Sequence, residues 1–284
     1  MSLDEILIED IVTYIRANNG PDENGSGHPD RKRLECGDLE VAIERAEQRD
    51  LAPGLKPYHF NSTMGVWKDE SYVDEVVVKK IDQLLAEKYD NDLVSLIVNT
   101  DKIELIKPLT EHYNGRELKV KVSAVASAHF DNCPFKIVSK YIQLKGLQKE
   151  YSNLRPYHFA RTTRDTYKDE NNVNEVLVKK IEQLLATEKY SNNLTKLVME
   201  VDKNELSTPL IDKLNNKEVS VSMFHVLSKF KSVYRVLKRY HEVKSLEFPF
   251  TEDCFYCSPE TRRKRIAEVC ARTGYQGVGK EKAG

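Results

Sequence analysis

The sequence lacks the features that would direct a chain into a membrane or out of the cell. Its first residues, 1–16, carry four acidic side chains, whereas a secretory signal begins with basic residues and continues into an apolar stretch. No apolar run approaches the roughly 18–20 residues that span a bilayer. The 5 cysteines are few, odd in number and unevenly spaced, as is typical of reduced thiols. We therefore expect a cytoplasmic protein, with the nucleus as the alternative, and no membrane partner.

The sequence also lacks the common catalytic signatures. It contains no GxxxxGK[ST] loop, no GxGxxG loop after a strand, no HExxH pair and no GxSxG elbow. These motifs mark nucleotide, dinucleotide, zinc-protease and serine-hydrolase sites. Their absence favours a protein that is not an enzyme and that needs no cofactor.

The chain has no large excess of either charge overall, but its two ends are oppositely charged. The formal net charge is −1, while 40% of the residues are hydrophobic and 31% are charged, a balance that supports a folded core under a charged surface. Residues 1–56 carry 7 Lys/Arg and 13 Asp/Glu, and residues 229–284 carry 13 and 7. The basic end favours a polyanionic partner, or pairing with the acidic start within one molecule or between two.

Two segments of the chain repeat each other. LKPYHF at 55–60 matches LRPYHF at 154–159, and 11 of the 14 positions in 73–86 are identical in 173–186. This similarity predicts a tandem duplication of a unit of roughly 100 residues. We expect an α+β fold made of four parts: an acidic helical head (1–52), repeat unit 1 (53–150), repeat unit 2 (151–250) and a basic helical tail (251–284).

Periodicity and capping residues predict the secondary structure. Helical spacing of apolar residues indicates helices over 3–18, 39–50, 73–86 and 173–186. Ser258, Pro259 and Gly274 bound a further helix, and Asp101 and Asp202 start two short ones. We expect Pro108 and Pro209 to open second short helices. Short apolar runs and alternation predict strands over 93–98, 117–127, 135–147, 194–199, 219–227 and 234–246.

The shared PYHF motif is the first candidate site. Its tyrosine and histidine suit a ligand patch that uses hydrogen bonding, proton transfer and stacking: Tyr58, His59, Tyr157 and His158. The alternative is that the proline sets an extended entry and the aromatic rings fill the core of each unit. The acidic pairs 69–70 and 169–170 suit a metal near these histidines, or equally the start of a helix, where acids are favoured.

Cations and tyrosines on the predicted strands form the second candidate. A β surface with both residue types is how single-strand nucleic-acid binders of the oligonucleotide-binding type hold their ligand, although lysines also protect ordinary strand edges. The residues are Lys119, Lys121, Lys136, Lys140, Tyr141, Arg235, Lys238, Arg239 and Tyr240. On the terminal helix, Arg262, Arg263, Lys264 and Arg265 suit phosphate contacts, a nuclear-import signal or a solvated face.

Cys254 and Cys257 form a CxxC pair, which is half of a zinc site. Cys270 lies 13 residues beyond Cys257, which is roughly 20 Å along an unbroken helix, too far to share one metal. Zinc is therefore the weaker interpretation, and unliganded thiols the stronger one.

These observations favour a non-enzymatic binding module built on an internal pseudo-dimer, with nucleic acid as the leading partner. The alternative is a structural or assembly protein that serves as a protein-interaction platform. A third hypothesis is a hydrolase or nuclease that uses His59 or His158 with the neighbouring acids. The sequence does not indicate an oligomeric state.

Overall fold

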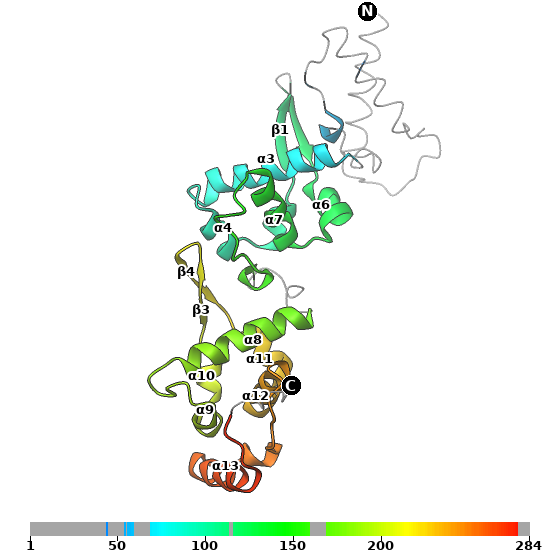
Figure 1. Cartoon of the computed structure of the whole chain (residues 1–284). Coiled ribbons are helices and arrows are strands. Elements are labelled where there is room, and N and C mark those ends of the chain that lie inside the picture. Colours follow the sequence, from blue (N-terminus) through cyan, green and yellow to red (C-terminus); the bar gives the residue numbers. More distant parts are fainter. Residues whose placement is uncertain are drawn as a thin grey trace, which may run out of the picture. The chain divides into compact units, whose positions relative to one another are not determined.

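The structure is a computed structural model that describes residues 44, 54, 56–59, 69–113, 116–159 and 169–277. The chain divides into two compact units, Met1–Glu150 (unit 1) and Tyr151–Gly284 (unit 2). Figure 1 shows helices in both units and a small hairpin in each. The predicted α+β class is confirmed, whereas the helices predicted over 3–18 and 39–50 lie outside the described residues apart from Glu44, which is helical.

Unit 1 contains helices of several lengths around one hairpin. Its elements in chain order are η1 (Pro57–His59), α3 (Glu70–Lys88), α4 (Leu93–Asn99), α5 (Lys102–Ile106), β1 (Leu109–Tyr113), β2 (Arg116–Val120), α6 (Val122–Val125), η3 (Ala126–Phe130) and α7 (Pro134–Leu144).

Unit 2 follows nearly the same order and then continues. Its elements are η4 (Pro156–Phe159), α8 (Glu170–Leu185), α9 (Leu194–Glu200), α10 (Lys203–Ser207), β3 (Leu210–Leu214), β4 (Lys217–Val221), α11 (Phe224–Phe230), α12 (Val233–Val243), η5 (Glu252–Cys254) and α13 (Pro259–Thr273). The tandem duplication itself stays a prediction from the sequence.

The helices α3 and α8 organise the core of their units. Asp69 and Asp169 cap them by accepting the N–H groups of Ser71 and Asn171, each at 2.8 Å. The predicted apolar stripe of α3 is buried in the unit core: Val73, Val77, Ile81, Leu84 and Leu85. In α8 the stripe is buried at Val173, Leu177 and Ile181, whereas Leu184 and Leu185 are half-buried. In Figure 1, α7 runs alongside α3 and α12 lies under α8.

The hairpins replace the predicted second short helices. Pro108 and Pro209 precede strands β1 and β3 instead of opening helices. Each strand pairs in antiparallel register with the next one, for example Leu210 with Val221. Asn215 and Asn216, at φ of 52° and 62°, form the turn of the second hairpin. Two consecutive left-handed residues are the requirement of a tight hairpin turn, which asparagine tolerates better than most side chains.

Four predicted strands are helices, and two are strands only in part. The runs 93–98 and 194–199 form α4 and α9, because Asp92 and Asn193 cap their first turns. The runs 135–147 and 234–246 form α7 and α12. The alternating segments end as strands at Val120 and Val221, and short helices follow. The prediction that the nucleic-acid candidates lie on a β surface is therefore wrong for the residues of α7 and α12.

The predicted terminal helix is confirmed as α13. Ser258 accepts the N–H of Thr261 at 3.3 Å, and Gly274 ends the helix at φ 70°. The helix packs against α9, so the basic tail is part of compact unit 2. Over the described parts of the chain, no helix combines the length and apolarity needed to cross a membrane.

Candidate functional site

The PYHF motif forms a short turn in each unit, and its tyrosine and histidine are buried. Tyr58, His59, Tyr157 and His158 are 1%, 4%, 2% and 3% exposed. The Nδ1 atom of each histidine accepts the backbone N–H three residues earlier, at 3.0 Å in unit 1 and 2.9 Å in unit 2. The motif predicted as a ligand patch thus places these four side chains in the core, as the alternative interpretation expected.

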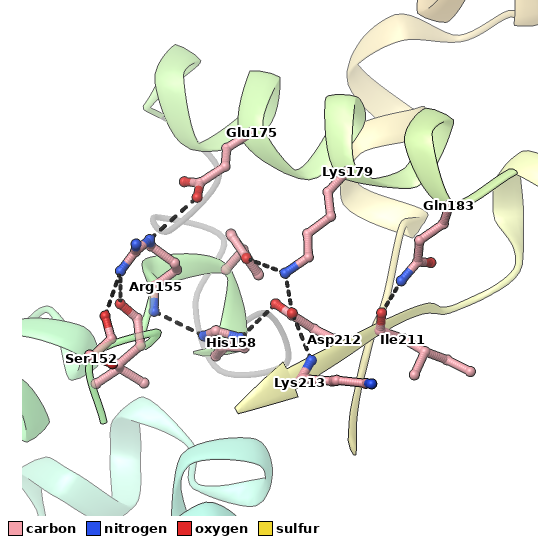
Figure 2. A network of polar contacts seen from close by, with 11 residues as sticks. Ser152, Arg155, His158, Glu175, Lys179, Gln183, Ile211, Asp212 and Lys213 are labelled. Atoms are coloured by element: carbon pink, nitrogen blue, oxygen red, sulfur yellow. Dashed lines mark hydrogen bonds and ion pairs between the residues drawn. The ribbon is translucent and has the colours of Figure 1, made fainter. Parts of the chain in front are cut away.

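In unit 2 this turn is joined to α8 and to β3 by a polar network (Figure 2). His158 Nε2 lies 2.8 Å from Oδ2 of Asp212, and Lys179 reaches both the other oxygen of Asp212 and the hydroxyl of Tyr157. Because Nδ1 of His158 is an acceptor, the ring is neutral and its proton sits on Nε2, which donates to Asp212. Lys179 therefore supplies the positive charge that balances the buried carboxylate.

A related arrangement occurs in unit 1, where Glu111 stands in the first hairpin strand as Asp212 does in unit 2. Lys79 donates to the hydroxyl of Tyr58 at 2.7 Å and to Oε2 of Glu111 at 3.2 Å. Tyr58 in turn donates to Glu75 at 2.9 Å. Both units therefore combine a tyrosine, a histidine, a lysine and a carboxylate, and we call each set the core tetrad.

The electrostatics of the tetrads favour a structural role. Burial alone would raise the pKa of Asp212, but hydrogen bonds from His158, Lys179 and Tyr157 hold it well below its usual range. Burial raises the pKa of Tyr58 to about 12, and burial with the hydrogen bond to Asp212 raises that of Tyr157 further. These phenols stay protonated near neutral pH and are not general bases. Both nitrogens of His158 are already engaged.

Sequence reasoning missed half of each tetrad. Lys79, Lys179, Glu111 and Asp212 were not among the predicted site residues. The sequence did contain a signal, because both repeats have a lysine at positions 79 and 179 and an acid at positions 111 and 212. The contact itself joins residues 33 positions apart in unit 2, which no local pattern reveals.

Two of the four cationic candidates of unit 1 are paired with acids of the same unit. Lys136 contacts Asp131 at 2.7 Å, and Lys140 contacts Glu70 at 2.9 Å. Lys119 and Lys121 are exposed at the end of β2 and just after it. Half of the cationic candidates of unit 1 are therefore already held by an anionic neighbour.

The two candidate tyrosines are core residues. Tyr141 is 4% exposed and donates to Asp82 at 2.8 Å, and Tyr240 is 5% exposed. Both face α3 or α8 from the buried side of α7 or α12. They are not available to stack on a nucleobase, so this part of the prediction is wrong.

The cations of α12 differ in their availability. Arg239 donates to Asn174 at 2.8 Å and contacts Glu170 and Glu242. Arg235 is exposed and lies 3.8 Å from Glu252 of η5, and Lys238 is exposed one turn later. Arg235 thus links the start of α12 to η5.

The four basic residues at the start of α13 do not share one role. Arg262 is buried and donates to the backbone carbonyls of Val201, at 2.7 Å, and Val198. It caps the C-terminal end of α9, where carbonyls are unpaired and the helix dipole favours a cation. The prediction of an outward-facing Arg262 is wrong. Arg263, Lys264 and Arg265 are exposed.

An open hollow of about 460 Å³ lies beside these exposed cations. We call it the η5 hollow, and its lining residues are Thr251, Asp253, Cys254, Tyr256 and Arg265. Tyr256 is 68% exposed, and its hydroxyl donates to Glu252 at 3.1 Å. Arg265 donates to the backbone carbonyl of Asp253 at 2.7 Å, which fixes the guanidinium at the rim. The hollow therefore combines an accessible aromatic ring with an oriented cation.

The CxxC pair lies next to this hollow without forming a ligand set in the described residues. Cys254 is buried, and the thiol of Cys257 donates to the carbonyl of Cys254 at 3.3 Å. Cys270 lies near the other end of the unbroken helix α13. Within the ranges that the structure describes, no group of three or more His, Cys, Asp or Glu could hold a metal ion. Zinc at this pair stays a prediction.

Comparison with protein-family models, with curated proteins and with solved structures gave no significant match. Function is therefore inferred from the geometry of this chain alone.

Proposed function

We propose that the protein is a nucleic-acid-binding module whose contact surface is the η5 hollow and the exposed start of α13. One observation supports this proposal above the others: Tyr256 and Arg265 line the same hollow, and Arg263 and Lys264 are exposed on the same helix, with Arg263 3.9 Å from Glu200. Single-stranded nucleic acid is bound by exposed aromatic rings that stack on bases and by cations that follow the backbone.

The proposal differs from the one that the sequence alone favoured. The strand cations and Tyr141 and Tyr240 are mostly paired or buried, so the contact surface moves to unit 2. Arg235, on α12, adds a further exposed cation near η5, since it lies 3.8 Å from Glu252. No buried catalytic group is required, because binding uses only exposed side chains.

The first experiment measures binding of the full chain to single-stranded and double-stranded DNA and RNA by fluorescence anisotropy across a salt series. We expect micromolar binding to single strands at low salt and weaker binding to duplexes. The test variant is Arg263→Glu/Lys264→Glu/Arg265→Glu, which leaves the buried Arg262 in place. It should bind more than about tenfold more weakly, because it loses several phosphate contacts. Each lost contact on a single strand also reduces the slope of log affinity against log salt concentration by roughly 0.7.

A matched control separates a local contact from a change in total charge. Lys107→Glu/Lys121→Glu/Lys149→Glu reverses three exposed lysines of unit 1 and alters the net charge by the same amount. We expect this variant to bind like the parent chain. Equal weakening by both variants, or no binding of the parent chain at low salt, would refute the proposed function.

The second candidate function is a protein-interaction platform, and one observation favours it. Phe224, at the start of α11, is 71% exposed. Single exposed apolar residues are common on soluble proteins, which ranks this candidate second. Phe224→Ser should abolish a complex with a protein partner in size-exclusion chromatography, and a complex that survives nuclease and Phe224→Ser would contradict that role for α11.

A further inference from the structure

The η5 hollow has one more feature that a general stacking surface does not require. Asp253 lines the hollow, and its backbone carbonyl accepts from Arg265. The Asp253 side chain is exposed and has no hydrogen bond or ion pair within the described residues. A carboxylate repels phosphate, so its presence at the edge of a nucleic-acid contact calls for a different partner: a group that donates hydrogen bonds.

We propose that the η5 hollow selects an unpaired guanine. This inference rests on the proposed function and names the base that the same surface prefers. The guanine ring would stack on Tyr256, and its N1–H and N2–H groups would donate to the two oxygens of Asp253. Arg265, held by the Asp253 carbonyl, directs its remaining N–H groups toward the adjoining phosphate.

The chemistry of the bases supports this choice. Single-stranded bases are read through their Watson–Crick edges while they stack on aromatic side chains. On that edge guanine alone presents two adjacent donors, which match the two oxygens of one carboxylate. Adenine and cytosine each present a donor beside a ring nitrogen acceptor, and uracil presents one donor between two carbonyls. Those acceptors would face the lone pairs of Asp253 and weaken binding.

The size of the hollow suits one base. Its volume of about 460 Å³ lies within the range of roughly 300–1,000 Å³ that is usual for small-ligand sites. Tyr256 is anchored at its hydroxyl by Glu252, and Cys254 of the lining is buried and close to the Thr251 hydroxyl, at 3.6 Å. The platform is therefore held in place before a ligand arrives, which lowers the cost of ordering it on binding.

The experiment uses the full chain and labelled ten-nucleotide uridine strands that carry one central guanosine, inosine or adenosine. Inosine keeps N1–H and lacks the amino group, so it tests the second donor directly. We expect guanosine to bind at least about fivefold more tightly than adenosine, with inosine in between, since a bidentate base contact contributes on the order of 1–3 kcal/mol. Thymidine strands with one deoxyguanosine determine whether the preference extends to DNA.

Three variants separate base selection from general affinity. Asp253→Asn should remove the preference for guanosine and leave the salt slope unchanged, because Asp253 meets no phosphate. Tyr256→Ala should weaken the binding of all three strands by a similar factor. Tyr256→Phe keeps the ring but loses the hydroxyl contact with Glu252, so it should weaken binding less. Circular dichroism of each variant checks that the fold is retained.

The outcomes of the two proposals are distinct. Equal affinity for guanosine, inosine and adenosine, in a chain that still binds strands with a salt slope, would overturn the guanine inference and leave the proposed function standing. A guanosine preference that persists in Asp253→Asn would also overturn it. No binding to any strand would overturn both.

Discussion

Asp212 shows how a single buried charge is made compatible with a folded core. Its side chain is 5% exposed, and an unpaired carboxylate at that depth would cost several kcal/mol. The neutral His158 donates to one oxygen, and the cationic Lys179 contacts the other. The network also ties the PYHF turn to α8 and β3. The histidine and tyrosine of the motif therefore serve to position backbone segments, and their burial explains why both repeats carry them.

Replacement of Asp212 by asparagine should destabilise unit 2. The amide keeps one acceptor and loses the charge that balances Lys179, while Lys179 is 34% exposed and is partly rescued by water. We expect a loss of about 2 kcal/mol in the free energy of unfolding, the order found when one partner of a buried charged hydrogen bond is removed. Urea denaturation followed by circular dichroism measures it. The control Asp131→Asn, at a carboxylate that is 80% exposed, should show no measurable change; equal effects would argue against the network.

The contribution of Asp212 should also depend on pH in a defined direction. Its folded pKa is well below the ordinary value of 3.8, so the unfolded chain takes up the proton first as the pH falls. The stabilisation is therefore fully present above that ordinary value and declines as acid is added toward the folded pKa. The difference in unfolding free energy between the parent chain and Asp212→Asn should be larger at pH 7 than at pH 3. A difference that stays constant would show that the carboxylate is not the group responsible.

At the scale of elements, capping residues predicted structure better than apolar runs did. Asp101 and Asp202 start α5 and α10 as expected, and Ser258 starts α13. The strands predicted over 135–147 and 234–246 are wrong, since a segment with interspersed apolar residues suits either element until its neighbours are known. The burial pattern is helical: Ile137, Val138, Tyr141 and Ile142 in α7.

The candidate site was predictable only in part, because its contacts join residues that are far apart in the sequence. The basic run on α13 was recognised from composition, but the burial of Arg262 depends on where the end of α9 lies in space. Arg262 and Val201 are 61 positions apart. Tyr256 and Asp253 were not singled out, because nothing in a local pattern shows that η5 leaves them beside Arg265.

Arg262 should be more important to stability than to binding. Arg262→Met keeps much of the apolar stem and removes the hydrogen bonds to the end of α9. We expect a loss of about 2 kcal/mol, because buried carbonyls lose charged donors. Thermal or urea unfolding measures it, with Arg263→Met, an exposed neighbour, as the control that should change little. Hydrogen exchange should accelerate first in α9, and unchanged protection there would contradict the capping role.

The second hairpin turn offers a stabilising change. Asn216 has φ of 62°, a conformation that glycine adopts at lower cost than any other residue. Asn216→Gly should therefore raise the unfolding free energy by up to roughly 0.5–1 kcal/mol, since asparagine followed by glycine is the preferred sequence for this turn. Asn216→Val, which cannot relax there, should lower it. The two variants should shift the denaturation midpoint in opposite directions, and a shift in the same direction would show that the turn conformation is not the cause.

At the scale of the whole molecule, the two units share an order of elements and differ in their surfaces. In unit 1, Lys136 and Lys140 are paired with nearby acids. Unit 2 continues beyond α12 into η5 and α13, which have no counterpart after α7 of unit 1 before the second repeat begins. The added segment carries both the hollow and the exposed cations. An extension confined to unit 2 suits a division of labour in which unit 2 makes the proposed contact.

The overall charge then sets the strength of that contact. With a net charge of −1 the chain has no long-range positive field, so the proposed function requires attraction to a polyanion to come from the few cations around η5. Three or four of them, Arg235 and Arg263–Arg265, predict a slope of log affinity against log salt of roughly −2 to −3 for a single strand. Raising salt from about 50 to 200 mM should weaken binding by roughly 20- to 50-fold.

Anisotropy titrations at four salt concentrations measure the slope. A slope steeper than about −5 would require cations from elsewhere on the chain, and one near zero would mean that phosphate contacts contribute nothing. Either result would move the contact surface away from the η5 hollow, because the number of cations there is fixed by the fold of unit 2.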